Sequence, residues 1–289
     1  MRIAILTSIT MLAVAANSVL ARLALSDGDI DPLAYTGIRL ASGALILAII
    51  FRLRSRKELL GKSWIAGTWS GAFSLLLYAI TFSTAYVMIG AGPGALILFA
   101  SVQIAMIAWA IIKGDWPAPL EWIGIGIAFG SLVYLLSPGL VAPSLMGALL
   151  MAVAGVAWGA YCLIGRASRF PLADTAGNFI RCAPIGFVLI GLGTALSHPS
   201  VKGIAYALAS GALASALGYI IWYSVLPSLS RTRAALVQLT VPPLAAMGGV
   251  FLIGEMLTWR LLIATAGVIG GVAVALIASE RRVHNNGKP

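Results

Sequence analysis

The chain has 289 residues, of which 60% are hydrophobic and only 10% are charged, with a formal net charge of +10. Soluble domains carry about 25% charged residues, so this sequence offers too little polar surface to cover a water-soluble fold of its size. Disordered chains are poor in apolar residues, which excludes disorder as well. The composition therefore predicts a polytopic membrane protein.

Ten stretches are apolar for about 20 residues, the length that an α-helix needs to cross a hydrocarbon core of about 30 Å. In chain order they are 3–23, 33–51, 64–88, 93–112, 120–136, 144–165, 173–195, 203–226, 232–253 and 259–279. Strands of a membrane barrel would be about 10 residues long and strictly alternating, whereas segments such as 44–50 are continuously apolar. The predicted fold class is therefore an all-α membrane protein with ten transmembrane helices.

The basic residues predict the topology. With a cytoplasmic N-terminus, most of the 19 lysines and arginines fall on the inner side, and Arg22, Lys202 and Arg260 remain outside. The positive-inside rule then places both termini in the cytoplasm. We interpret the basic excess as a topology signal that contacts anionic lipid headgroups, and we expect no nucleic-acid partner.

The sequence contains a weak internal repeat. The segment 95–115 matches the segment 235–255 at a constant offset, and Gly130 then falls on Gly270. We predict a first five-helix repeat over 1–138, a second over 144–281, and a cytoplasmic tail over 282–289. Because five is odd, the second repeat is inverted, an arrangement that places a substrate site near the midplane and permits alternating access.

Several motifs resemble a known family. The run 234–236, Pro242-Pro243, the run 252–255 and the glycines within 267–271 are similar to the second-repeat signature of EamA-type transporters in the drug/metabolite transporter superfamily. The segment 158–166 resembles the opening helix of a repeat, although Val14, Ala15 and Ala16 depart from that pattern in the first repeat. The resemblance implies a ten-helix exporter of amino acids and other metabolites in the inner membrane of a bacterium. The layout is also similar to that of aromatic-amino-acid and methyl viologen exporters.

Polar and aromatic side chains within the spans are the candidate solute site. Mid-span amides offer both a donor and an acceptor, which suits a zwitterion, although they could equally form interhelical hydrogen bonds. Aromatic faces can stack a ring or hold a cation, although most bundle aromatics simply pack. The candidate substrate-binding residues are Asn17, Tyr78, Phe82, Phe99, Gln103, Trp158, Tyr161, Tyr219, Trp222 and Gln238.

Two arginines, Arg39 and Arg181, lie at corresponding positions within spans. Each could extend to the headgroups, bind carbonyl oxygens at a helix end, or attract a substrate carboxylate. We favour a structural role for both. For Arg181, Asp174 is a further candidate partner two turns away.

No aspartate or glutamate lies in the middle of a predicted span, and Glu255, near the end of its span, is the nearest exception. A proton antiporter normally uses an ionisable group at mid-membrane, so we predict facilitated diffusion or exchange. The sequence holds no nucleotide-binding loop and no hydrolase or metal motif, so we expect neither an enzyme nor a cofactor nor a metal.

Prolines and glycines indicate where helices break and where they pack closely. Pro184 and Pro242-Pro243 are expected to interrupt their helices. Close contacts are expected at the small-residue pairs Gly67/Gly71, Gly126/Gly130, Gly155/Gly159 and Gly267/Gly271.

The leading functional hypothesis is an exporter of amino acids, including aromatic ones, that works by alternating access as a monomer or weak homodimer. A carrier of sugar phosphates or nucleotide sugars would need more basic residues in its cavity than Arg39 and Arg181. The sequence is also compatible with a carrier of cationic drugs and with a membrane-embedded scaffold that transports nothing.

Overall fold

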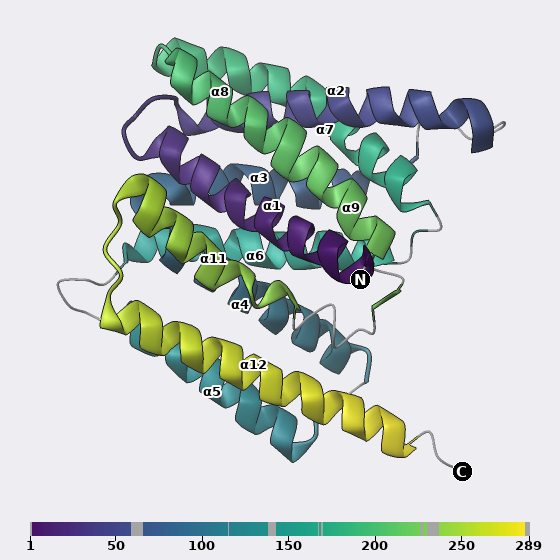
Figure 1. The fold of residues 1–289 in the computed structure, drawn as a ribbon, viewed down its shortest axis with the longest axis vertical. Coiled ribbons are helices and arrows are strands. Elements are labelled where there is room, and N and C mark those ends of the chain that lie inside the picture. The colour runs from purple at the N-terminus through teal and green to yellow at the C-terminus, as the bar shows by residue number, and fades with distance from the viewer. Residues whose placement is uncertain are drawn as a thin grey trace.

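The structure, a computed structural model, describes residues 2–58, 66–114, 116–137, 143–166, 168, 170–225, 228–229 and 237–286. All regular elements in these ranges are helical, and they form the bundle in Figure 1. They are α1 (Arg2–Leu25), α2 (Pro32–Glu58), α3 (Trp69–Met88), α4 (Ala91–Ile112), α5 (Pro119–Leu136), α6 (Leu145–Arg166), α7 (Pro171–Leu196), α8 (Val201–Ala209), η1 (Ser210–Leu217), α9 (Gly218–Val225), α11 (Val241–Gly248), η3 (Gly249–Ile253) and α12 (Trp259–Asn286).

Within the described ranges, nine helices are long and apolar enough to cross a membrane, with α8, η1 and α9 counted as one continuous helix. Side chains that point outward from these helices are largely apolar, as expected where lipid replaces water. Trp116, Trp122 and Trp259 are exposed near helix ends, the positions typical of an interfacial aromatic belt. The predicted all-α membrane fold is confirmed.

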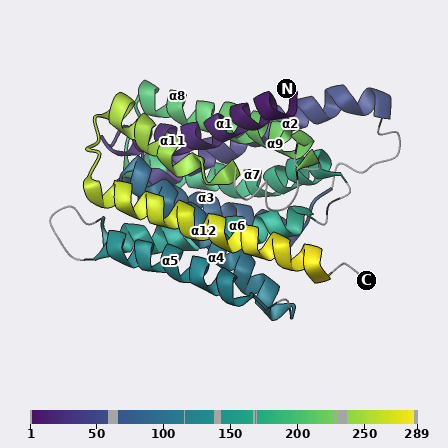
Figure 2. The same ribbon diagram turned by 60° about the horizontal axis from the view of Figure 1, so that its bottom comes forward.

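The helices pack in an order that brings distant parts of the chain together. α2 lies along α7, and α5 lies along α12 on the other side of the bundle, as both views show (Figures 1 and 2). Between them, α6 contacts α3 and α4, while α1 contacts α8, α9 and α11. The division into two inverted repeats stays a prediction. Under that division α6 corresponds to α1, and the contacts of α6 with α3 and α4 correspond to those of α1 with α8, α9 and α11.

α1 begins and α12 ends at the same end of the bundle (Figure 1), which agrees with an even number of crossings. The other end holds Arg22, in the last turn of α1, and Glu255, just after η3. We call it the Arg22 end. It is the end that the charge distribution predicts to face outward.

Of the two helix breaks expected at prolines, the one at Pro242-Pro243 is present, because the chain turns at residues 239–240 just before α11, and the one at Pro184 is not. The predicted span 232–253 is not one long helix: α11 and η3 run only from Val241 to Ile253, about 20 Å at 1.5 Å per residue. Pro242 and Pro243 stand in the first turn of α11, where their missing N–H groups cost nothing. Pro184, by contrast, lies inside the continuous helix α7 and does not break it.

A distortion that the sequence did not reveal lies in the eighth span. Between α8 and α9 the helix widens into the π-helical segment η1. Gly211 on this segment faces α2 so closely that an added Cβ would overlap the backbone carbonyl of Arg39. The absence of a side chain at this position lets η1 approach α2.

The small-residue pairs do not all make helix contacts. Gly271 packs against the backbone of α5 near Gly124 and Ala128, and Gly155 packs against α4. The prediction for Gly126 and Gly130 is wrong, because an added Cβ at either position would meet nothing within 4 Å. The register of α5 is the reason: it turns Gly124 rather than Gly126 toward α12.

Candidate functional site

A small cavity lies at the centre of the bundle, where α1, α3, α4, α6, η1 and α9 meet. Its volume is about 20 Å³, which is room for about one water molecule. Half of its lining residues are aromatic, and the others include one amide and one serine hydroxyl. The lining residues are Val14, Asn17, Ser18, Tyr78, Phe82, Leu98, Phe99, Trp158, Ala214 and Tyr219.

The aromatic walls form a continuous set of ring contacts across three helices. Tyr78 contacts Phe82 and Trp158 with ring centroids 5.2 and 5.1 Å apart, and Trp158 contacts Tyr219 at 5.1 Å. All three pairs are tilted, with interplanar angles of 51°, 45° and 42°, in the range of separations that aromatic pairs prefer. The cavity can therefore offer ring edges and ring faces to an apolar or cationic part of a solute.

The polar wall is a hydrogen-bonded network centred on Tyr78. The Asn17 amide donates to the Tyr78 hydroxyl at 3.3 Å and accepts from the Ser210 hydroxyl at 2.5 Å. Arg39 donates through Nη2 to the same Tyr78 hydroxyl at 3.0 Å and through Nε to Ser215 at 3.2 Å. Four elements, α1, α2, α3 and η1, are thus joined by buried hydrogen bonds.

The structure brings most of the predicted site residues to this cavity. Asn17, Tyr78, Phe82, Phe99, Trp158 and Tyr219 line it. The role of all ten residues in solute binding stays a prediction.

The other four lie further away. Tyr161 is buried against Trp158, with ring centroids 5.5 Å apart. Gln103 and Trp222 are buried about one turn beyond Phe99 and Tyr219, outside the lining. Gln238 lies before the start of α11, in the segment that supplies Val237 and Thr240 to a different cavity.

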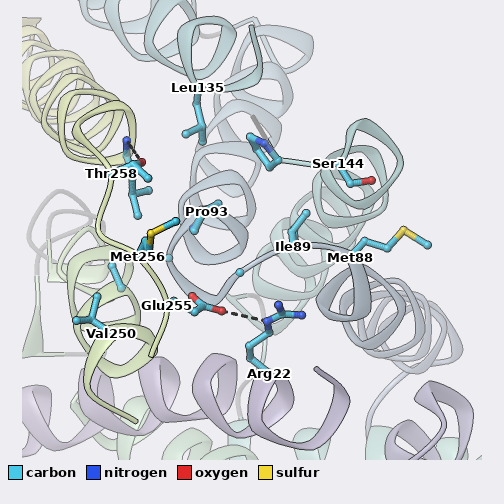
Figure 3. Close-up of a pocket in the computed structure, with 15 residues that line it drawn as sticks. Arg22, Met88, Ile89, Pro93, Leu135, Ser144, Val250, Glu255, Met256 and Thr258 are labelled. Atoms are coloured by element: carbon cyan, nitrogen blue, oxygen red, sulfur yellow. Dashed lines mark hydrogen bonds and ion pairs between the residues drawn. The ribbon is translucent and has the colours of Figure 1, made fainter. Parts of the chain in front are cut away.

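A second cavity, of about 350 Å³, opens at the Arg22 end (Figure 3). Arg22 and Glu255 form an ion pair in its wall, with Arg22 Nε and Glu255 Oε1 3.0 Å apart. Both side chains are about one-fifth exposed. This pair joins α1 to the segment between η3 and α12.

The ion pair also binds the turn between α3 and α4. Arg22 donates through Nη1 to the carbonyl oxygen of Tyr86, at 2.8 Å, in the last turn of α3. Glu255 accepts the backbone N–H of Ala91, the first residue of α4, at 2.8 and 3.1 Å. A cation at a helix C-terminus and an anion at a helix N-terminus both complement the helix dipoles, so each charge is stabilised by its partner and by a helix end.

A third cavity, of about 840 Å³, lies toward the opposite end, between the first half of α1 and residues 237–244. Its walls are mainly apolar, with Thr7, Ser8 and Thr240 as polar members. Along the length of the bundle, the central cavity therefore lies between the cavity at the Arg22 end and the cavity toward the opposite end.

The two membrane arginines differ in their surroundings. Arg39 does not extend to the headgroups: it is 2% exposed and its guanidinium lies over the rings of Tyr78 and Phe82 at 5.1 and 5.0 Å. Arg181 binds the carbonyl oxygen of Ala66, just before α3, and lies over Trp69. Its candidate partner Asp174 accepts the backbone N–H of Gly67 and the hydroxyl of Ser168.

Carboxylates in the described helices lie at their ends. Glu121 is in the first turn of α5, Asp174 in the first turn of α7, and Glu255 follows η3. The side chains of Asp115 and Glu280 lie outside the described residues.

Sequence reasoning missed Ser210 and Ser215. Their spacing of five residues places them on different faces of an α-helix, so the sequence pattern connects neither serine to the other or to Asn17. In η1 the hydrogen bonds run from i to i+5, and the wider turn brings both hydroxyls toward the Asn17–Tyr78–Arg39 network. The signal available was the two serines in the middle of a mainly apolar span.

Fold and site define a multi-pass membrane protein built around a small central cavity. A model of the EamA-like transporter family matches residues 1–137 and 145–277, one match within each predicted repeat. The chain belongs to this family, and so to the drug/metabolite transporter superfamily, and it is a membrane transporter.

Curated relatives cover almost the whole chain. An uncharacterized protein of Pseudomonas aeruginosa is 45% identical over 286 residues, which is 99% of this chain and 98% of the relative. The threonine/homoserine exporter RhtA of Escherichia coli K12 is 31% identical, over 88% of this chain and 83% of its own. RhtA of Salmonella typhimurium is 32% identical, over 81% of this chain and 78% of its own.

A solved crystal structure of a protein has the same fold. It superposes with a TM-score of 0.68 at 20% identity, over 96% of this chain and 99% of its own. At this identity the likeness concerns the fold alone.

Proposed function

We propose that this protein exports amino acids, including aromatic ones, and related small metabolites across the inner membrane of a bacterium. The observation that carries the proposal is the central cavity, where the Asn17 amide and the Tyr78 hydroxyl lie beside the aromatic rings of Phe82, Trp158 and Tyr219. A zwitterion with an apolar side chain needs both kinds of surface. The RhtA relatives, which export threonine and homoserine by their names, support the same substrate class.

We propose alternating access as the mechanism. The central cavity is too small for an amino acid, so the aromatic walls must move apart on one side to admit a solute. The Arg22–Glu255 pair supports a closed state at the Arg22 end, because it joins α1 to the α3–α4 turn.

We further propose that transport is facilitative or an exchange. The absence of a mid-depth carboxylate from the described helices supports this proposal, since such a group would be needed for protons and solute to compete at one site. Glu255 is bound to Arg22 and to the N-terminus of α4, which suits a closing element rather than a proton carrier.

Counterflow in proteoliposomes tests the proposed function. Vesicles preloaded with one unlabelled amino acid from a panel are diluted into a trace of the same labelled amino acid. We expect transient accumulation of label for a subset that includes threonine or homoserine, and strongly reduced accumulation for Asn17→Ala and Tyr78→Ala. If the wild-type protein exchanges amino acids but neither variant differs from it, the assignment of the central cavity is wrong.

A further inference from the structure

The most unusual charge in the described part of the chain is Arg39. It lies on α2 at the depth of the central cavity network, is 2% exposed, and its Nη1 atom is fully buried without a hydrogen-bond partner. An arginine side chain stays protonated in proteins, and burying a charge without a partner of opposite sign is strongly unfavourable. A permanent cation has therefore been placed in the interior with part of its bonding capacity unused.

Among the described residues, the partners that Arg39 does have are all neutral. They are the hydroxyls of Tyr78 and Ser215 and the rings of Tyr78 and Phe82. The salt bridges Arg22–Glu255 and Lys202–Asp29 both lie at the Arg22 end and do not involve Arg39. Hydroxyls and ring faces stabilise a guanidinium but leave its charge unbalanced.

The groups around Arg39 are mainly hydrogen-bond donors. The Tyr78 oxygen already accepts from both Arg39 and Asn17, which leaves its own proton free to donate. The Asn17 oxygen is occupied by the Ser210 hydroxyl. The cluster Asn17–Tyr78–Arg39 thus combines a positive charge with several donors, the complement of a carboxylate.

This cluster adjoins the cavity. Tyr78 and Asn17 line it, and Arg39 lies behind the Tyr78 ring that forms part of its wall. When the rings separate to admit a solute, an anionic group entering beside Tyr78 approaches a guanidinium that lies 5.1 Å from the Tyr78 ring centroid and has one nitrogen, Nη1, without a hydrogen-bond partner. A cation entering the same space meets a like charge, which disfavours the carrier of cationic drugs.

We propose that Arg39 binds the carboxylate of the transported solute, together with the Tyr78 hydroxyl and the Asn17 amide. The proposal rests on the proposed function and deepens it: a free carboxylate becomes the feature that the central site selects. The ring faces of Trp158, Tyr219 and Phe99 are then left for the rest of the molecule, including an ammonium group, which such faces attract.

The test compares each amino acid that exchanges with its own methyl ester as competitors in counterflow, using the full chain in proteoliposomes. The wild-type protein should prefer the free acid. Arg39→Gln should reduce the acid-to-ester preference by about 10- to 100-fold, the effect of one hydrogen bond to a charged group. The reduction should come mainly from weaker binding of the free acid. Arg39→Lys, which keeps the charge but not the planar fork, should reduce it less.

Arg181→Gln is the matched control, because it removes the corresponding arginine of the second predicted repeat, which binds the Ala66 carbonyl instead. It should leave the acid-to-ester preference unchanged. The proposal is overturned if Arg39→Gln lowers acid and ester transport in equal proportion, or if the preference survives the substitution. If Arg39→Gln does not fold, Arg39→Lys takes its place, and an acid-to-ester preference equal to that of the wild-type protein then overturns the proposal.

If the wild-type protein exchanges no amino acid, the proposed function fails and the carboxylate site is tested separately. Thermal stability of the purified full chain is then measured with acetate, lactate and succinate, each against its matched amide. Stabilisation by a carboxylate that is lost in Arg39→Gln supports the site. Equal stability with carboxylates and amides in the wild-type protein overturns it.

Discussion

Tyr78 is the residue on which the central site depends most. Its ring contacts Phe82 and Trp158, and its hydroxyl accepts from Arg39 and Asn17. Ring and hydroxyl therefore have separable functions: the ring shapes the cavity, and the hydroxyl supports two buried donors on other helices.

Tyr78→Phe separates these functions, because it keeps the ring and removes the hydroxyl. We expect a loss of stability of about 1–3 kcal/mol, since buried donors of Arg39 and Asn17 lose their acceptor. Transport should also fall, by about tenfold or more. Tyr134→Phe, on an exposed tyrosine of α5, is the control and should change neither quantity. If thermal denaturation shows Tyr78→Phe to be as stable as the wild-type protein, the role given to the hydroxyl is contradicted.

At the scale of elements, the proposed closure of the Arg22 end depends on one ion pair placed between two helix termini. Glu255→Gln keeps the shape of the side chain and removes the charge that Arg22 and the α4 N-terminus both attract. We expect the closed state to lose about 1 kcal/mol, which is about fivefold in population.

A cysteine at Ala246, in the wall of the Arg22-end cavity, reports this opening in a background where Cys162 and Cys182 are serine. Glu255→Gln should increase its rate of labelling by an impermeant maleimide severalfold. Asp29→Asn removes the exposed Lys202 pair at the same end and serves as the control. Equal labelling in all three proteins would show that Arg22 and Glu255 do not hold this end closed.

The packing of α5 against α12 depends on glycines at their contact. An added Cβ at Gly271 would lie 2.6 Å from the backbone nitrogen of Ala128, so Gly271→Val should destabilise the protein by about 1–3 kcal/mol. Gly126→Val introduces the same side chain where nothing lies within 4 Å and should be tolerated. The apparent melting temperatures of the two variants check this prediction. A lower melting temperature for Gly126→Val than for Gly271→Val would contradict the contact geometry.

The same elements explain what the sequence could and could not predict. Long apolar segments located the spans because lipid imposes a length and a composition on every crossing. Mid-span amides and aromatics led to Asn17, Tyr78 and Trp158 because polar groups avoid lipid and turn inward. The π-helical turn of η1, and with it Ser210 and Ser215, depends on tertiary contacts with α2 that no local pattern records. The contrast between Arg39 and Arg181 likewise depends on which neighbours each arginine meets.

At the scale of the whole molecule, the proposed mechanism has a consequence for energetics. With no mid-depth carboxylate in the described helices, a proton gradient should not be coupled to the solute. We expect an imposed pH gradient of either sign to leave the steady-state level of a counterflow substrate in proteoliposomes unchanged. Uphill accumulation driven by that gradient would show that a titrating group, with Glu255 the first candidate, takes part in transport.

The measurement that tests the central claim most directly is counterflow of labelled threonine in proteoliposomes that contain the wild-type protein. A carrier with one site exposed alternately to each side produces a transient overshoot of label in vesicles preloaded with unlabelled threonine, and none in vesicles without preload. The structure and the RhtA relatives predict that overshoot, and its loss in Tyr78→Ala. Label that enters equally with and without preload, or that enters protein-free vesicles as fast, would contradict an amino-acid exporter that works by alternating access.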